Sequence, residues 1–303
     1  MLAFDADTRP METGSIPVED LPGGFDLQST VESGQSYLWR REDGRMYETT
    51  HAYGGSAWYY AVTDCEVVRA RQRDGLLEWE STTDAESLLV SLLRLDDDLD
   101  AILDATPEDS LVETAYDEYR GMRIVRDPFF PCLVSFICSA QMRVRRIYDM
   151  QTALARRFGE SVEFDGKTYH EFPTPTQLAA ADESDLRALK LGYRAPYVRK
   201  SAELLASGEV TAEDVRGLPY EDARDAMQAF VGVGDKVADC VLLFALGYLE
   251  AVPLDTWIQS AIEEHYPHCD RGSYRDTSRA IREQFGGEYA GYAQTYVFHY
   301  LRS

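Results

Sequence analysis

The spacing of hydrophobic residues changes about a quarter of the way along the chain. Before residue 84, aromatic, apolar and threonine residues fill strand-length pieces at 34–43, 45–62 and 65–81, separated by turn sequences at 42–45 and 53–56. The last piece contains an Asp-Gly pair between two short strands, which is a strong hairpin signal. From residue 84 onward, apolar residues recur at the 3.6-residue period of an α-helix.

The second pattern continues to the end of the chain. It predicts helices within residues 84–103, 130–159, 174–191, 195–208, 222–231, 236–247, 256–266 and 289–301. We therefore predict an α+β fold, with an N-terminal antiparallel β domain at residues 1–118 and an all-α domain at residues 119–303. No internal repeat interrupts this division.

Composition narrows the class of protein. The chain has 303 residues, 45% of them hydrophobic, which is enough for a sizeable core. No run approaches the roughly 20 apolar residues that span a bilayer, and no secretory leader is evident. Five cysteines without a C-x2-C pair argue against a disulfide framework, a zinc ribbon or an iron–sulfur loop. We expect a cytoplasmic monomer without metal or organic cofactor.

The charge is strongly negative, with 53 acidic against 30 basic residues and a net charge of −23. Such a surface suits a salt-rich, halophile-like cytoplasm and argues against non-specific nucleic-acid binding. Basic residues nevertheless gather at 141–157 and 190–200. These two islands predict an anion-facing surface, although a solvated helix face would have the same composition.

The stretch FVGVGDKVADC at residues 230–240 predicts two helices joined by a tight turn. Gly232 and Gly234 would permit positive φ and leave amide groups free for a phosphate, although they could also simply cap a helix. Lys236 follows in the first helical turn with Cys240 on the same face, where an uncharged amine could act as a nucleophile. Asp255 comes nineteen residues after Lys236, at a position that also suits a helix N-cap.

These residues are similar to a motif of a known protein family. GVGDKVADC with AVPLD resembles the helix–hairpin–helix–Gly/Pro–Asp superfamily of base-excision DNA glycosylases, and more narrowly the eukaryotic-type 8-oxoguanine DNA glycosylase/lyases. The narrower similarity recurs in GQS at 34–36, LVSFICSA at 133–140, TYHEFPTP at 168–175, LGYRAPYV at 191–198 and GYAQTYVF at 291–298. It spans roughly residues 20–303. The family fold, a sheet domain followed by helical domains, agrees with the periodicity.

The resemblance implies a role for each matching residue. Lys236 would attack the sugar C1′, Asp255 would stabilise the cationic sugar, and Cys240 would flank the base pocket. Gly34 would accept N7–H of 8-oxoguanine, while Gln294 and Phe298 would contact and stack on the everted base. The residues implied to contact damaged double-stranded DNA are Gln141, Arg146, Tyr193, Arg194, Gly232, Val233 and Gly234.

The chain departs from the family pattern at three places. Gln141 and Met142 stand where asparagines are common, Trp257 replaces a histidine that contacts phosphate, and Phe230 with Val231 replaces Leu-Pro at the hairpin. Trp257 would line the pocket with an aromatic ring, as in glycosylases that bind cationic alkylated bases. The alternatives are therefore a glycosylase for 3-methyladenine-type purines on the same fold, or a non-catalytic DNA-binding module.

Overall fold

The computed structural model describes residues 11–48 and 56–302. Its helices are α1 (Leu27–Glu32), α2 (Glu86–Leu92), α3 (Leu99–Asp104), α4 (Ser110–Glu118), α5 (Phe129–Cys138), α6 (Val144–Phe158), α7 (Pro175–Ala179), α8 (Glu183–Leu186), α9 (Ala195–Ser207), α10 (Tyr220–Met227), α11 (Asp235–Val241), α12 (Thr256–His265), α13 (Tyr274–Gln284) and α14 (Ala290–Arg302). A π-helical turn, Leu242–Leu246, continues α11. None of the described helices is long and apolar enough to cross a membrane.

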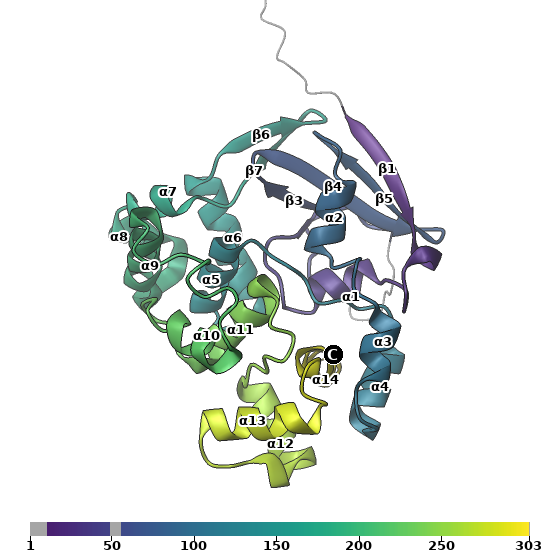
Figure 1. The fold of residues 1–303 in the computed structure, drawn as a ribbon. Coiled ribbons are helices and arrows are strands. Elements are labelled where there is room, and N and C mark those ends of the chain that lie inside the picture. Colours follow the sequence, from purple (N-terminus) through teal and green to yellow (C-terminus); the bar gives the residue numbers. More distant parts are fainter. Residues whose placement is uncertain (1–10, 49–55, 303) are drawn as a thin grey trace, which may run out of the picture.

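The predicted α+β architecture is confirmed (Figure 1). Strands β1 (Glu12–Pro17), β2 (Arg40–Arg41), β3 (Tyr59–Thr63), β4 (Glu66–Arg73) and β5 (Leu76–Ser81) form one antiparallel sheet in the order β1-β5-β4-β3-β2. The predicted Asp-Gly hairpin joins β4 to β5, with both turn residues in the left-handed conformation (φ 52° at Asp74 and 79° at Gly75).

The sequence patterns were wrong about several local elements. Residues 34–39 and 45–48 are loops and turns, because only Arg40–Arg41 pairs with β3. The predicted turn at 53–56 lies largely outside the described residues. Strand β1 and helix α1 were not predicted, since neither carries a clear period on its own. Strand β1, for example, forms because it pairs along the whole of β5.

A second hairpin interrupts the part of the chain predicted to be all-helical. Strands β6 (Ser161–Phe164) and β7 (Lys167–His170) pair around a turn at Asp165 and Gly166. Its apolar side chains form a small cluster with Val62 and Val67 of the sheet. The helical prediction failed here because these short strands gain stability only by packing against the distant sheet.

The C-terminal helix returns to the N-terminal half of the molecule. Helix α14 packs against α4, α12 and α13, near the centre of the view in Figure 1. Two of its tyrosine hydroxyls donate hydrogen bonds across the chain, Tyr292 to Asp97 (2.6 Å) and Tyr296 to the carbonyl of Met122 (2.6 Å). One continuous core therefore connects the sheet with the helices, and it sets α14 beside the loop that follows α1.

Candidate active site

A cavity of about 1000 Å³ opens between the loop after α1, helix α5, the segment from α11 to α12, and α14. It brings together predicted site residues from five separate parts of the chain. These residues are Gly34, Gln141, Lys236, Cys240, Asp255, Trp257, Gln294 and Phe298. The predicted nucleophile and the predicted carboxylate therefore face one common space.

Lys236 extends into this cavity from the first turn of α11. Its Nζ donates a hydrogen bond to Ser139 Oγ (3.0 Å) and lies 5.3 Å from the centre of the Phe136 ring. A hydroxyl and an aromatic face hold the amine in place. Lys236 therefore presents its amine to the cavity in a fixed position.

Asp255 begins α12 as its N-cap. One carboxylate oxygen, Oδ1, accepts hydrogen bonds from the amides of Trp257 (3.0 Å) and Ile258 (2.9 Å). The carboxylate is thus fixed in orientation by backbone donors while it lines the cavity. Both roles predicted for this position, cap and cavity carboxylate, are structurally compatible.

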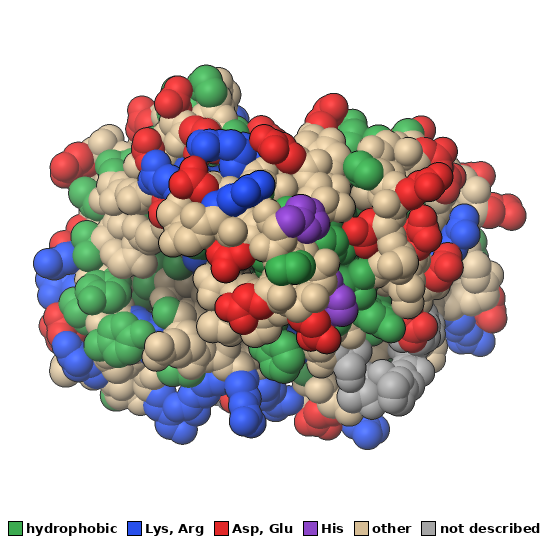
Figure 2. All heavy atoms as spheres, turned by 90° about the horizontal axis from the view of Figure 1, so that it is seen from below, with side chains coloured by type: hydrophobic (Ala, Val, Ile, Leu, Met, Phe, Trp, Pro, Cys, Tyr) green, Lys and Arg blue, Asp and Glu red, His purple; other side chains and the backbone are tan. Residues whose placement is uncertain are grey.

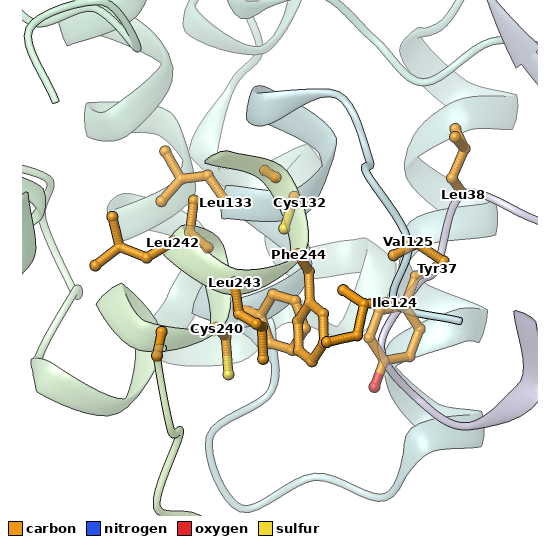
Figure 3. Packing of buried hydrophobic residues seen from close by; sticks show 14 of the residues in the cluster. Tyr37, Leu38, Ile124, Val125, Cys132, Leu133, Cys240, Leu242, Leu243 and Phe244 are labelled. Carbon is orange, nitrogen blue, oxygen red and sulfur yellow. The ribbon is translucent and has the colours of Figure 1, made fainter. Parts of the chain in front are cut away.

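Cys240 lies one helical turn after Lys236 on the same face of α11. Burial raises the pKa of its thiol to about 12, the Lys236 charge opposes this increase, and the Asp255 charge adds to it. Figure 3 shows the Cys240 sulfur and the Tyr37 hydroxyl on the same side of the packed cluster, beside Phe244. The thiol is therefore a neutral, apolar part of the cavity wall.

The opposite wall is built from Gly34 and α14. Gly34 adopts φ +93°, and a Cβ at this position would lie 2.7 Å from Nη1 of Arg302 and 3.2 Å from Cγ2 of Val144. Gln294 and Phe298 line the same wall, one helical turn apart on α14. Any residue other than glycine at position 34 would therefore strain the left-handed backbone and displace the Arg302 guanidinium.

The predicted hairpin joins α10 to α11 outside the cavity. Gly232 has φ +86° and packs so closely on Tyr197 that a Cβ would lie 2.7 Å from its ring. Gly234 does not use the positive φ that a glycine permits: this N-cap residue is extended (φ −104°) with open space around its Cα. Gly232 and Gly234 are exposed, whereas Val233 is buried. The hairpin thus presents backbone to solvent.

Two loops with left-handed backbone stand beside the cavity mouth. Gln141 has φ 55° and is exposed, and Tyr193, just after Lys190 (φ 70°), is 53% exposed. Arg194 is only 3% exposed: it donates a hydrogen bond to the Ala140 carbonyl and lies 4.3 Å from the Tyr193 ring centre. Arg194 therefore connects the two loops and supports Tyr193, while its implied contact with damaged DNA stays a prediction.

Part of the predicted basic surface is neutralised by neighbouring acids. Arg145 pairs with Asp149 (3.2 Å), Arg157 with Asp185 (3.3 Å) and Arg199 with Glu203 (3.1 Å). Within the described residues, Arg146 of α6 has no ion pair, and it lies outside the cavity lining. Figure 2 shows Lys and Arg side chains gathered along the lower edge of one face, with acidic side chains spread over the rest.

Several cavity residues were not predicted as site residues from the sequence. The most important are Tyr37, Phe136, Ser139, His299 and Arg302. Ser139 and Phe136 lie within the LVSFICSA segment, and Arg302 continues the spacing of Gln294 and Phe298 along α14, so both signals were present in the sequence. Among the described residues, no cluster of His, Cys, Asp or Glu is arranged to hold a metal ion.

Comparisons with known proteins agree with this geometry. Residues 134–286 match the model of the HhH-GPD superfamily of base excision DNA repair proteins, and residues 17–133 match the N-terminal domain of 8-oxoguanine DNA glycosylase. A probable N-glycosylase/DNA lyase of Methanothermobacter thermautotrophicus is 30% identical over 95% of both chains.

Two further relatives place the chain within this group. The 8-oxoguanine glycosylase/lyase of Clostridium acetobutylicum, solved with double-stranded DNA containing cytosine opposite 8-oxoguanine, is 28% identical, with a TM-score of 0.81 over 92% of each chain. A DNA-3-methyladenine glycosylase of Bacillus subtilis is 28% identical over 53% of this chain and 54% of its own length. The two matched segments run from residue 17 to 286 and contain β2 to β5, the hairpin, Lys236 and Asp255, but not α14. The chain belongs to the HhH-GPD superfamily of base excision DNA repair proteins.

Proposed function

We propose that this protein is a bifunctional DNA glycosylase and abasic-site lyase that removes 8-oxoguanine from double-stranded DNA. The observation that carries the proposal is the convergence of Lys236 and Asp255 on one cavity large enough for a nucleobase. A purely DNA-binding module requires neither an amine nor a carboxylate there. Membership of a base excision repair superfamily gives this pair a reaction to perform.

The chemistry follows from an uncharged amine beside an everted deoxyribose. The Lys236 nitrogen forms a bond to C1′ as the bond from C1′ to the base breaks, and the base leaves with the electron pair and gains a proton. Asp255 stabilises the positive charge that develops on the sugar. The sugar ring then opens to a Schiff base, and loss of a C2′ proton expels the phosphate on the 3′ side.

Base recognition would use the wall opposite the lysine. The Gly34 carbonyl would accept the N7 proton that 8-oxoguanine carries and guanine lacks. Phe298 would stack on the base, and Gln294 would contact its Watson–Crick edge. The N-terminal domain, residues 1–118, therefore contributes to the pocket through Gly34, while residues 119–303 supply the reacting groups.

DNA would lie across the hairpin and the two exposed loops. The backbone at Gly232, Val233 and Gly234 would hold a phosphate. Tyr193 and Gln141 would fill the gap left by the everted base, and Arg146 and Arg194 would contact the cytosine that loses its partner. Hydrogen bonds from backbone amides allow a protein of net charge −23 to bind DNA with few exposed cations. We place this activity in the cytoplasm, on chromosomal DNA, with the protein acting as a monomer.

A second candidate, excision of 3-methyladenine-type purines, rests on Trp257. This side chain is 52% exposed at the cavity, where its ring would favour an electron-poor, cationic base. In that reaction Lys236 would be dispensable. The two candidates separate when duplexes carrying 8-oxoguanine or 3-methyladenine, each opposite all four bases, are scored for free base and for strand nicking.

Borohydride trapping tests the proposed nucleophile directly. The chain has four lysines, at 167, 190, 200 and 236, and of these the cavity lining contains Lys236. We expect borohydride to trap a covalent adduct on an 8-oxoguanine duplex with the wild type and with Lys167→Gln, a matched exposed lysine. Lys236→Gln should form no adduct, and an adduct that persists in this variant contradicts the proposal.

A further inference from the structure

Three side chains follow one another along the cavity face of α14. Gln294, Phe298 and Arg302 are spaced four residues apart, so they lie in a row on one side of the helix. All three line the cavity that contains Lys236 and Asp255. Arg302 extends the row that the resemblance assigns to base recognition, and neither the family model nor the proposed function uses it.

The guanidinium of Arg302 lies against this wall, and one of its nitrogens lacks a partner in the described part of the chain. Its Cζ lies 5.0 Å from the centre of the Phe298 ring, and its Nη1 lies 2.7 Å from the position that a Cβ on Gly34 would occupy. Nη1 is buried and has no hydrogen-bond acceptor among the described residues. A buried donor of this kind is costly unless something accepts from it.

The nearby carboxylates of the cavity wall do not supply that acceptor. Glu32 accepts from Tyr47 and Tyr59 and pairs with Arg41 (3.4 Å). Asp255 uses Oδ1 for the two amides that it caps. Among the described residues neither carboxylate forms an ion pair with Arg302, so a ligand with an exposed oxygen would supply the acceptor that Nη1 lacks.

Electrostatic effects place Arg302 close to the proposed reaction centre. Burial raises the pKa of Tyr37, the Arg302 charge lowers it, and Cys240 and Asp255 raise it further. The charges of all three groups therefore act on the Tyr37 hydroxyl. Burial, followed by the Arg302 charge, lowers the pKa of His299 to about 3, so His299 is neutral and Arg302 carries the positive charge of this wall.

Gln294 shows a second unsatisfied atom on the same row. Its side chain is 4% exposed, and Oε1 is buried without a hydrogen-bond partner in the described part of the chain. An unsatisfied acceptor and an unsatisfied donor therefore lie on either side of Phe298. Such a pair matches a planar heterocycle that presents both N–H groups and carbonyl oxygens along its edge.

We propose that Arg302 determines the base specificity of this pocket, by donating a hydrogen bond to a carbonyl oxygen of the everted base and by disfavouring purines that carry a positive charge. This inference rests on the proposed function. 8-Oxoguanine is neutral and carries carbonyl oxygens at C6 and C8, whereas 3-methyladenine and 7-methylguanine are cationic while attached to deoxyribose. Two like charges in a partly dehydrated cavity repel strongly.

Arg302 should affect excision of the base and not cleavage at a pre-formed abasic site. Contact with the base changes excision of the base but leaves cleavage at a pre-formed abasic site unchanged, because no base is present there. Contact with a DNA phosphate would instead change both steps and the affinity for every duplex. One set of duplexes can therefore show whether Arg302 donates to a base carbonyl or to a DNA phosphate.

The test uses single-turnover kinetics on full-length Arg302→Met and Arg302→Lys. Methionine keeps an unbranched apolar stem against Phe298 but removes the charge and the donors. We expect Arg302→Met to excise 8-oxoguanine about tenfold to hundredfold more slowly, as for loss of a charge-assisted hydrogen bond. Excision of 7-methylguanine should rise severalfold, and cleavage of an abasic duplex should stay within about twofold of wild type. Arg302→Lys should recover part of the discrimination.

Three outcomes overturn the inference. Unchanged 8-oxoguanine excision by Arg302→Met excludes a base contact, and an equal loss of excision and abasic-site cleavage indicates a structural role. Weaker binding of a duplex carrying a tetrahydrofuran abasic analogue assigns the guanidinium to a phosphate. A wild-type protein that excises no 8-oxoguanine refutes the proposed function instead, and the rise in 7-methylguanine excision by Arg302→Met still tests the charge argument separately.

Discussion

Helix α11 separates two polar regions of opposite character. On one side, Asp239 and Arg224 form an ion pair (2.9 Å) whose side chains are fully buried. Hydroxyls of Tyr220 and Tyr274 donate to the two oxygens of Asp239, at 2.7 and 2.8 Å. We call these four residues the buried ion cluster; each oxygen of its carboxylate has at least one donor.

On the other side of α11, the cavity leaves polar atoms unsatisfied. Gln294 Oε1 and Arg302 Nη1 are buried there without partners among the described residues. Satisfied buried polar groups hold a fold in one arrangement, whereas unsatisfied ones are costly unless a ligand completes them. The buried ion cluster on one side of α11 is therefore structural, and the unsatisfied atoms on the other side are available to a ligand. Variants on the two sides should differ in stability, and they are taken here from the largest expected effect to the smallest.

The largest stability effect is expected from Asp239→Ala. This change removes the buried counter-charge of Arg224 and leaves it only the partly exposed Glu221 (3.0 Å), and breaking a buried pair typically costs about 3–5 kcal/mol of unfolding free energy. Asp235→Ala is the matched control, because Asp235 lies on the same helix but pairs with half-exposed Arg275 at the surface (2.8 Å). That surface pair should be worth less than about 1 kcal/mol. Urea unfolding measures both, and equal losses would contradict the assignment of the buried ion cluster.

A smaller and pH-dependent effect is expected from Asp127, which lies behind the cavity wall. Burial raises the pKa of its carboxyl to about 7, opposed by the hydrogen bond from Ser36 Oγ (2.7 Å). Because the folded state holds this proton more tightly than the unfolded state, the unfolding free energy falls as pH rises from about 4 to 7. The loss is on the order of 2–4 kcal/mol and is complete above the folded-state pKa.

Asp127→Asn should remove this dependence, so the variant gains stability relative to wild type at pH 8 but not at pH 4. Ser36→Ala should extend the dependence to higher pH and enlarge the total loss, because it deletes the hydrogen bond that favours the ionised carboxylate. Thermal unfolding from pH 4 to 8 measures all three proteins. Parallel curves for wild type and Asp127→Asn would show that another group controls the slope.

The smallest stability effect is expected from Asp255→Asn, in the cavity. Asparagine caps a helix about as well as aspartate, so unfolding free energy should change by less than about 0.5 kcal/mol. Release of 8-oxoguanine should nevertheless fall strongly, since a neutral amide cannot stabilise a cationic sugar. Calorimetry and single-turnover assays on the same preparation check both parts. A normal excision rate would remove Asp255 from the chemistry.

The sequence was most informative where neighbouring residues decide the structure. The helical period from residue 84 onward, the Asp-Gly turn between β4 and β5, and the N-cap at Asp255 depend on contacts within a few positions. The spacing of Lys236 and Cys240 likewise placed both on one face of α11.

The tertiary structure decided what depends on distant partners. Strand β1 pairs with β5, and β6–β7 packs on the sheet, only because folding brings those surfaces together. Burial of Arg194 depends on the Ala140 carbonyl, and the isolation of Arg302 depends on Gly34, more than 250 positions earlier in the chain. Local periodicity determines which face of a helix is polar, but whether a polar atom finds a partner depends on the surface it meets.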